Sequence, residues 1–381
     1  MTRVAMLVTN ACHPDPRVER HAQWLSQLDC QVTIHAFDRT QTYAASELVE
    51  GVRIMRYHIG TFPYGASVST QFGIKKFQRM VQSTLRRDPP DLVYCHDADT
   101  LPVGVALHKK HGIPFVFDMH DLHHSWIRMH HPHSLLRNII SMVQKNRMLK
   151  GARKATCVVT SSGEYPNGTY PGLQQWLGAH SIQSEVIENR PMSIDVQFSE
   201  RQKRPLTIGY VGRIRETTPF RFLLDAIKSM PVEQRPSLRI AGDGVSQKAV
   251  FAMIETAQSN GECEATLSGS FEMKDMKTLM GEIDVMFAMY SPTRENIRHG
   301  ALPTKMFDAA LYGKPSIVNA GCLMADVVDQ ESLGLAVEFG NISALVQAFG
   351  DAQSLQPILR RDGHHEQEKF IVLMKKILSM T

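Results

Sequence analysis

Short apolar segments alternate with helical patterns along the whole chain, and this alternation limits the folds that the chain can adopt. Segments of this kind, bounded by polar loops, are typical of strands in a parallel sheet that is covered on both faces. The pattern therefore predicts an α/β protein with doubly wound parallel sheets. The expected strands are residues 4–8, 32–36, 92–95, 115–118 and 157–160, then 207–211, 238–241, 265–267, 283–289 and 316–318.

A polar stretch at residues 188–205 divides the chain into two halves. It contains two prolines, and the fresh apolar strand LTIGYVG follows it directly. A length of 381 residues suits two domains of roughly 180 residues each. We expect a Rossmann-like domain at 1–190, a linker at 191–205, a second Rossmann-like domain at 206–362 and a terminal helix at 363–381. Helical spacing is also clear at 18–28 and 222–230.

The composition excludes several classes of protein. The hydrophobic content of 43% and charged content of 21% are typical of a soluble globular protein. A net charge of +4 does not indicate nucleic-acid binding. The six cysteines are dispersed without a CxxC pair, which favours reduced thiols in the cytoplasm. No apolar run approaches the roughly 20 residues of a membrane span. The oligomeric state is not predicted.

The segment HGALPTKMFDAALYGKPSIVNA, residues 299–320, carries the strongest indication of function. Pro303 suits a first helical turn, Gly313 a helix end, and Pro315 the start of a new strand. The unpaired N–H groups and the dipole of such a helix start favour an anion. Asp308 lies one turn further, where a carboxylate can accept the hydroxyls of a ribose. Together these features indicate a bound nucleotide.

The loop GYVGRIRETTPF follows the first strand of the second half. Gly212 lets the backbone approach a ligand, and Arg213 then offers a guanidinium suited to bidentate phosphate contact. Arg215 and Arg221 are further candidates. The alternative is that Arg213 forms a surface ion pair at the strand end.

Two more loops follow strands of the second half. The turn IAGDG places Gly242 and Gly244 where a base or ribose would lie, although such turns are common in αβ loops. The segment GSF, residues 269–271, is a weaker candidate for contact with the base.

Polar residues also follow the strands of the first half. His120, in VFDMHDLHH, is expected to contact a sugar hydroxyl or phosphate, or else to bond a neighbouring carbonyl. The segment YCHDADTLP offers acceptor-binding candidates or caps of a helix beginning near Thr100. The acceptor-binding candidates are His13 and Arg17, with Asp15 beside them, and His96, Asp97 and Asp99; Asp118 and Asp121 flank His120.

Two further readings concern metal and membrane. Eight histidines lie between residues 108 and 133, but the HExxH arrangement is absent and no cysteine stands at ligand spacing, so no metal site is expected. The basic amphipathic segment 72–87 is either a surface helix with its apolar side in the core or a peripheral contact with the inner membrane face. Its apolar stripe consists of Ile74, Phe77, Met80 and Val81.

These motifs together resemble the GT-B glycosyltransferases, in the GT4-like (group 1) family. The resemblance covers nearly the whole chain and is most specific in DPRVERHAQWL, HDADTLP, FDMHDLH, GYVGRIR, IAGDG and LPTKMFDAALYGKPSIV. It implies two Rossmann-like domains facing each other across a cleft, with ligands at the carboxyl ends of the strands. It also implies a retaining, metal-independent transfer that needs no cofactor.

The resemblance assigns roles to particular residues. Arg213 would hold the donor diphosphate, Asp308 the ribose, and His120 the donor sugar, while the N–H groups near Ala301 and Leu302 would face the diphosphate. Three positions depart from the family pattern: Thr218 replaces a lysine, Gly300 replaces an acid, and Asp308 replaces a glutamate. A lost charge-assisted contact is worth about 1.5–3 kcal/mol. Compensation is expected from Arg215, Lys305 or Arg221.

The expected function is transfer of a sugar, a hexose in the family pattern, from a nucleoside diphosphate donor to an acceptor hydroxyl. The expected donor is a UDP-sugar, and the acceptor is a polysaccharide, a glycolipid or a small metabolite. No carboxylate base is evident, which agrees with a leaving phosphate that takes the acceptor proton. The alternatives are a nucleotide-sugar epimerase and a catalytically silent protein that binds nucleotide-sugars.

Overall fold

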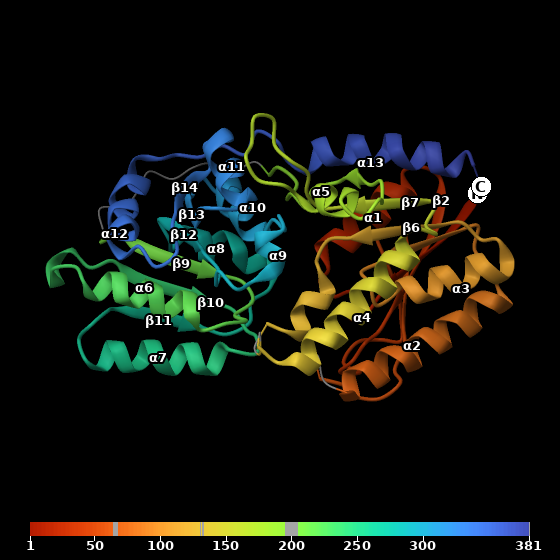
Figure 1. Cartoon of the computed structure of the whole chain (residues 1–381), viewed down its shortest axis with the longest axis horizontal. Coiled ribbons are helices and arrows are strands. Elements are labelled where there is room, and N and C mark those ends of the chain that lie inside the picture. Colours follow the sequence, from red (N-terminus) through yellow and green to blue (C-terminus); the bar gives the residue numbers. More distant parts are fainter. Residues whose placement is uncertain (64–67, 130, 132, 195–204, 381) are drawn as a thin grey trace. The chain divides into compact units, whose positions relative to one another are not determined.

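The computed structural model describes residues 1–63, 68–129, 131, 133–194 and 205–380 (Figure 1). Most of the expected linker, residues 195–204, lies outside the described part. The chain divides into two compact units. Unit 1 comprises Met1–Gly163, Gly172–Asn189 and His365–Thr381, and unit 2 comprises Glu164–Pro171 and Arg190–His364. Each unit therefore receives one segment from the other half of the sequence.

Unit 1 is built on a sheet of eight strands among its described residues, in the order β3-β4-β2-β1-β5-β6-β7-β8. All neighbouring strands are parallel except β3 and β4, which are antiparallel. The strands are β1 (Thr2–Val8), β2 (Cys30–Ala36), β3 (Ser46–Val49), β4 (Val52–Arg56), β5 (Leu92–His96), β6 (Phe115–Met119), β7 (Cys157–Thr160) and β8 (Glu185–Val186).

Helices cover this sheet because each presents an apolar stripe to it. Figure 1 shows α2, α3 and α4 side by side, and α3 packs against both of the others. The last helix returns to unit 1, where Phe370 stacks on His21 with ring centroids 4.6 Å apart. The helices are α1 (Pro16–Ser26), α2 (Val68–Arg87), α3 (Leu101–His111), the 3₁₀ helix η1 (His123–Ile127), α4 (Leu135–Ala152), α5 (Leu173–Gly178) and α13 (Gly363–Leu378).

Unit 2 is built on a parallel sheet of six strands among its described residues, in the order β11-β10-β9-β12-β13-β14. These are β9 (Thr207–Val211), β10 (Ser237–Ala241), β11 (Ala265–Ser268), β12 (Val285–Ala288), β13 (Ser316–Asn319) and β14 (Gly334–Val337). The helices are α6 (Thr218–Lys228), α7 (Gln247–Ser259), α8 (Met276–Gly281), α9 (Glu295–Arg298), α10 (Thr304–Leu311), α11 (Leu323–Gln330) and α12 (Ile342–Asp351); the short 3₁₀ turns are η2 (Val232–Gln234), η3 (Met273–Asp275) and η4 (Ala352–Ser354).

The segment Glu164–Pro171 belongs to unit 2 because several polar contacts hold it there. One carboxylate oxygen of Asp326 accepts hydrogen bonds from the N–H groups of Thr169 and Tyr170, both at 2.8 Å. The hydroxyl of Tyr165 donates to Glu331 at 2.6 Å, and the fully buried Arg190 pairs with the same carboxylate. These bonds hold both Glu164–Pro171 and Arg190 to unit 2.

The expected α/β architecture of two parallel sheets is confirmed, and each expected strand forms within a few residues of its predicted bounds. Strands β3, β4, β8 and β14 were not expected. β3 is an exposed edge strand, β4 alternates between buried and less buried residues, β8 is two residues long, and β14 is only partly buried, so none shows a strong apolar run.

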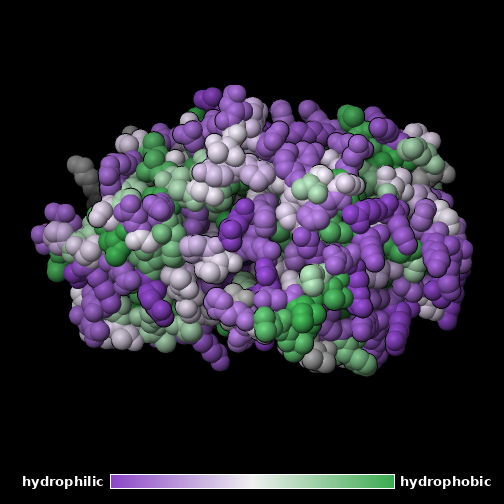
Figure 2. Space-filling view, viewed as in Figure 1, coloured by the Kyte–Doolittle hydropathy of each residue, from purple (hydrophilic) through white to green (hydrophobic). Residues whose placement is uncertain are grey.

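Two helices of unit 1 differ in where they place their apolar side chains. In α2 the residues Ile74, Phe77 and Val81 are buried in the core, as the surface-helix alternative expected, whereas Met80 is 42% exposed. Over the first half of α4, by contrast, Figure 2 shows apolar side chains gathered on the surface. Among the described helices, none has the length and apolar character to cross a bilayer.

Candidate functional site

In unit 1, the polar residues of interest gather where three adjacent parallel strands end. Strands β1, β5 and β6 are neighbours in the sheet, and the register pairs His96 with Asp118. Arg17 lies in the first turn of α1, which follows β1 after a short loop. Because the carboxyl ends of parallel strands meet at one edge, residues far apart in sequence are brought together here.

The carboxylate of Asp118 is the centre of this cluster. One oxygen lies 3.3 Å from Nη1 of Arg17, and the other lies 3.0 Å from Nδ1 of His96 and 3.6 Å from Nδ1 of His21. All four side chains are buried. Burial opposes ionisation of Asp118, but Arg17 and the imidazoles hold its pKa well below the usual value. Burial lowers the pKa of His21 and His96, so Arg17 carries the compensating charge.

A second ion pair lies beside this cluster. Nδ1 of His120 lies 2.6 Å from Oδ1 of Asp97. The other oxygen of Asp97, Oδ2, lies 4.0 Å from Nη2 of Arg17. Although burial opposes it, the charges of His120 and Arg17 hold the pKa of Asp97 at about 2. Burial and Arg17 lower the pKa of His120, but Asp97 outweighs them and the net shift is upward. Asp97 therefore orients His120 and raises its pKa.

The remaining candidates of unit 1 have local partners. Asp99 lies 3.3 Å from Nε2 of His123, and Asp121 accepts a bond from the indole of Trp126 at 2.8 Å. Asp15 caps α1, and the exposed His13 contacts the ring of Tyr43. The alternative reading of Asp97 and Asp99 as helix caps is wrong: Thr100 is the N-cap of α3, and no side chain caps that helix end.

The geometry of His21, His96 and Asp118 also bears on metal binding. Each of these three residues has one nitrogen or carboxylate oxygen that could bind a metal ion, and these three atoms lie within 4.8 Å of one another. However, the guanidinium of Arg17 already neutralises Asp118, and a divalent cation would meet its repulsion. The cluster therefore fits a buried ion pair better than a metal site. Nε2 of His96 is buried and has no hydrogen-bond partner among the described residues.

In unit 2, two glycine-containing loops lie against each other at the ends of β9 and β10. Gly212 N–H donates to Ala241 O at 3.0 Å, and Ile214 N–H donates to Asp243 O at 2.7 Å. Gly242 has φ +150°, and a Cβ there would lie 1.9 Å from the carbonyl oxygen of Gly212. The structure therefore brings Gly212, Gly242 and Gly244 together. Their backbones approach so closely that a side chain at Gly242 or Gly244 would overlap the neighbouring loop.

Lys305 is the most unusual residue of this half. It lies in the first turn of α10, is 8% exposed, and its Nζ has no hydrogen-bond partner among the described residues. The ammonium lies 3.4 Å from the ring centroid of Tyr210 and against Gly212, where an added Cβ would lie 3.6 Å from Nζ. Burial, and then the charges of Arg294 and Arg215, hold the pKa of Lys305 well below its usual value.

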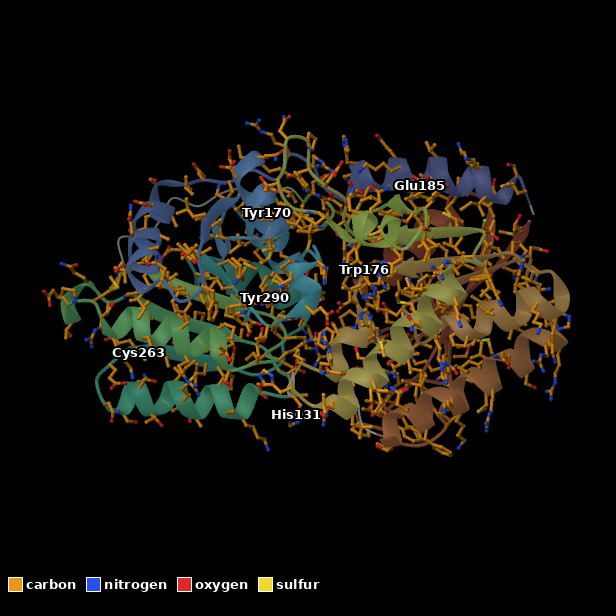
Figure 3. The ribbon with its side chains drawn as sticks, viewed as in Figure 1. His131, Tyr170, Trp176, Glu185, Cys263 and Tyr290 are labelled. Carbon is orange, nitrogen blue, oxygen red and sulfur yellow. The ribbon has the colours of Figure 1, made fainter. Side chains whose placement is uncertain are left out.

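The arginines of unit 2 divide between two environments. Arg213 is 59% exposed and pairs with Asp243 at 2.9 Å, which is the surface ion pair that the sequence left open. Arg294 lies with its guanidinium 4.6 Å from the ring centroid of Tyr290 and 3.5 Å from Glu216 (Figure 3 labels Tyr290). Arg215 is half-buried and acts electrostatically on Lys305. The positive charge around Lys305 thus comes from Arg294 and Arg215, and the charge of Glu216 partly offsets it.

The start of α10 differs in detail from expectation. The N–H of Ala301 donates to Asn296 O at 2.9 Å, so it is not free to face a diphosphate. The helix begins at Thr304, with Pro303 as its N-cap and Leu302 just before it. Asp308 lies half-buried one turn after Lys305, and its charge partly offsets the lowered pKa of that lysine. Arg221 lies exposed on α6.

Several residues of these clusters were missed by sequence reasoning. His21 lies on the buried side of the amphipathic helix α1, and Tyr210 lies in a buried strand, so neither shows a functional signal. Arg294 and Glu216 stand in polar loops after strands, where their position was a signal that could have been used. Tyr290 is held by Asn319, whose side-chain oxygen accepts from its N–H at 2.8 Å.

Comparison with known proteins identifies the class of this chain. Residues 14–165 match the glycosyl transferase 4-like domain, and residues 193–366 match the glycosyl transferases group 1. The chain therefore belongs to the GT-B glycosyltransferases of group 1. Among curated protein sequences, none matches it significantly.

Solved structures show the same fold at low sequence identity. Sucrose-phosphate synthase (tll1590) from Thermosynechococcus elongatus has a TM-score of 0.75 at 14% identity, over 100% of this chain and 99% of that one. Anabaena Alr3699/HepE in complex with UDP-glucose has a TM-score of 0.65 at 15% identity, over 100% of both chains. The catalytic domain of Starch Synthase IV from Arabidopsis thaliana, bound to ADP and acarbose, has a TM-score of 0.61 at 14% identity, over 99% and 95%.

Proposed function

We propose that this glycosyltransferase moves a sugar from a nucleoside diphosphate donor to an acceptor hydroxyl, with retention at the anomeric carbon. The observation that carries the donor site is Lys305, a buried ammonium that has no hydrogen-bond partner among the described residues. Burial lowers the pKa of this amine because its charged form is costly unless a counter-ion pairs with it. A diphosphate at the carboxyl edge of the unit 2 sheet would supply that counter-ion.

The surrounding residues support an anion in this position. Arg215 and Arg294 add positive charge near Lys305, although Arg294 also pairs with Glu216, and Gly212 lets a phosphate oxygen approach the backbone. The eight-residue helix α10 adds its N-terminal dipole. Asp308, on the flank of this helix, is proposed to bind the ribose hydroxyls. Arg213 is assigned an outer role, because binding there would require it to leave Asp243.

The proposed reaction needs no metal ion. As the bond between the anomeric carbon and the β-phosphate oxygen breaks, negative charge develops on the leaving diphosphate. Lys305 and the arginines are positioned to stabilise that charge, and such electrostatic stabilisation is usually the largest catalytic contribution. The acceptor oxygen bonds the same face of the anomeric carbon, and its proton passes to the leaving phosphate oxygen.

The polar cluster of unit 1 is proposed to serve the sugar and the acceptor. His120, oriented by Asp97, is a hydrogen-bond donor for a sugar hydroxyl. His96 offers a buried Nε2 without a partner among the described residues, although its ring is fixed by Asp118. The six cysteines are free thiols, which agrees with action in the cytoplasm, where nucleotide-sugars are made.

The base of the donor is the least constrained part of the proposal. The solved neighbour from Anabaena is described with UDP-glucose, and the neighbour from Arabidopsis with ADP. We propose a UDP-sugar as the first donor to test. Titration of UDP, ADP and GDP by calorimetry should give one preferred diphosphate.

Turnover then tests the reaction itself. Incubation of the preferred nucleotide-sugar with a panel of hydroxyl acceptors, in the presence of EDTA, should release the diphosphate and yield a product that keeps the anomeric configuration by NMR. His120→Ala should reduce turnover while leaving affinity for the free diphosphate unchanged. Binding without turnover across the panel would instead indicate a silent nucleotide-sugar-binding protein, and C2 inversion of the donor sugar would indicate an epimerase.

A further inference from the structure

Helix α4 of unit 1 presents its large apolar side chains to the surface. Leu135 is 79% exposed, and five further aliphatic or thioether side chains on the same half of the helix are each at least 41% exposed. Helical spacing places them on one broad side. The six residues, here called the α4 patch, are Leu135, Leu136, Ile139, Ile140, Met142 and Val143. Figure 2 shows an apolar area over α4.

The opposite side of the same half of α4 is polar and faces the protein. Ser141 is buried and donates to His124 O at 2.8 Å, and Arg137 donates to Ile127 O at 3.2 Å. Asn138 accepts a bond from Arg128 at 3.3 Å. A helix on a soluble protein normally buries its apolar stripe and exposes its polar one. In the first half of α4 the apolar side is exposed and the polar side is buried, which indicates an apolar partner outside unit 1.

The charged residues of α2, α3 and α4 are all basic. Helices α2, α3 and α4 contain eleven of the 42 lysines and arginines of the chain and none of its 38 acidic residues. On α4 itself, Arg147 and Lys150 are exposed and follow the patch at helical spacing. The chain as a whole has a net charge of only +4, so this basic character is a local property.

We propose that the α4 patch and the basic helices around it bind the surface of an anionic lipid bilayer. The apolar side chains would enter the boundary between headgroups and acyl chains, and the basic residues would attract anionic headgroups. The patch contains no aromatic side chain on which a nucleotide base could stack, which argues against nucleic acid. A two-fold contact between copies would place the basic helices against each other, which argues against a dimer. This inference does not depend on the proposed donor site.

Flotation of the full chain with lipid vesicles tests the proposal. The protein should bind vesicles of phosphatidylcholine with phosphatidylglycerol and should not bind phosphatidylcholine alone. The double variant Leu135→Glu with Ile139→Glu should bind the anionic vesicles about tenfold more weakly or worse. The matched control is Leu48→Glu, which changes a 71% exposed apolar residue on β3 of the same unit and should bind as the unmodified chain does.

A second pair of substitutions tests the electrostatic part. Arg147→Glu with Lys150→Glu should also weaken binding, and added salt should weaken binding of the unmodified chain. Unchanged tryptophan fluorescence and diphosphate affinity would show that the variants are folded. The proposal is overturned if the unmodified chain does not bind anionic vesicles, or if the patch variant binds them equally well. It is also overturned if the patch instead mediates dimerisation or binds RNA, measured by ultracentrifugation and by titration with an RNA oligonucleotide.

Discussion

At the scale of single residues, the proposed donor site is centred on Lys305, whereas the sequence favoured Arg213. The sequence favoured Arg213 because a strand, a glycine and an arginine follow one another there. It could not show that Asp243, thirty residues later, would form an ion pair with the guanidinium of Arg213. Nor could it show that Lys305, named only as a compensating residue, would be buried against an aromatic ring without a hydrogen-bond partner among the described residues.

Replacing Lys305 therefore separates binding from stability. Lys305→Met should weaken binding of the preferred diphosphate by about 10- to 100-fold, because a charge-assisted contact is worth about 1.5–3 kcal/mol. The melting temperature without ligand should stay the same or rise, since a buried ammonium is replaced by an apolar side chain of similar length. Calorimetry and thermal unfolding measure the two effects. Lys248→Met, at an exposed position on α7, is the control and should change neither the diphosphate affinity nor the melting temperature. Equal diphosphate affinity in both variants would remove Lys305 from the site.

Asp97 gives a prediction about pH. Its pKa is lowered to about 2 in the folded protein, from an ordinary value of 3.8, so its ionised form stabilises the fold above that ordinary value. Asp97→Asn should cost about 2 kcal/mol near neutral pH. The stabilisation is lost as the pH falls from 3.8 toward 2, so the difference in melting temperature should shrink between pH 6 and pH 3. Asp88→Asn, at an exposed position, is the control; a difference that does not vary with pH would contradict the assignment.

At the scale of elements, the glycines at the ends of β9 and β10 determine how closely the two loops approach. Gly242→Ala should destabilise unit 2 by about 1–3 kcal/mol through its positive φ alone, and its Cβ would also overlap the carbonyl oxygen of Gly212. Diphosphate binding should fall with it. Gly269→Ala is the matched control, because its Cβ would lie 3.5 Å from the nearest atom, in the side chain of Gln247. Calorimetric unfolding and diphosphate titration compare the two, and similar results for both variants would show that the loop contact is unimportant.

Elements were more predictable than their polar contacts. The buried strands could be found because a strand covered on both faces consists almost entirely of apolar residues, as in β1 and β9. The edge hairpin of β3 and β4 was missed, because β3 is mostly exposed and its residues carry no such run. The side of a helix that faces the protein was also unpredictable where polar side chains pack inward, as in α4. Both cases depend on tertiary partners, which spacing along the chain does not show.

At the scale of the whole molecule, the chain crosses four times between its two units, at 163/164, 171/172, 189/190 and 364/365. The sequence showed a terminal helix at 363–381 but not that it would complete the core of the N-terminal unit. There Phe370, Met374 and Ile377 are buried, and Phe370 stacks on His21, one of the imidazoles beside Asp118. The last helix thus supports the cluster that is proposed to bind the acceptor. The stability of unit 1 therefore depends on both ends of the chain.

This dependence can be measured because all three tryptophans, Trp24, Trp126 and Trp176, lie in unit 1. Phe370→Ala should destabilise that unit by about 3–5 kcal/mol, as expected for removal of a buried aromatic side chain. Unfolding followed by tryptophan fluorescence should therefore shift to lower temperature. Diphosphate binding by unit 2 should persist below the new transition.

The same helix offers the control for this experiment. Val372 is 71% exposed on α13, so Val372→Ala should leave the fluorescence transition unchanged. If Phe370→Ala behaved in the same way, the helix would not be part of the unit 1 core. If it abolished diphosphate binding while unit 1 remained folded, the helix would instead act on the donor site, and the assignment of the two binding roles to separate units would be wrong.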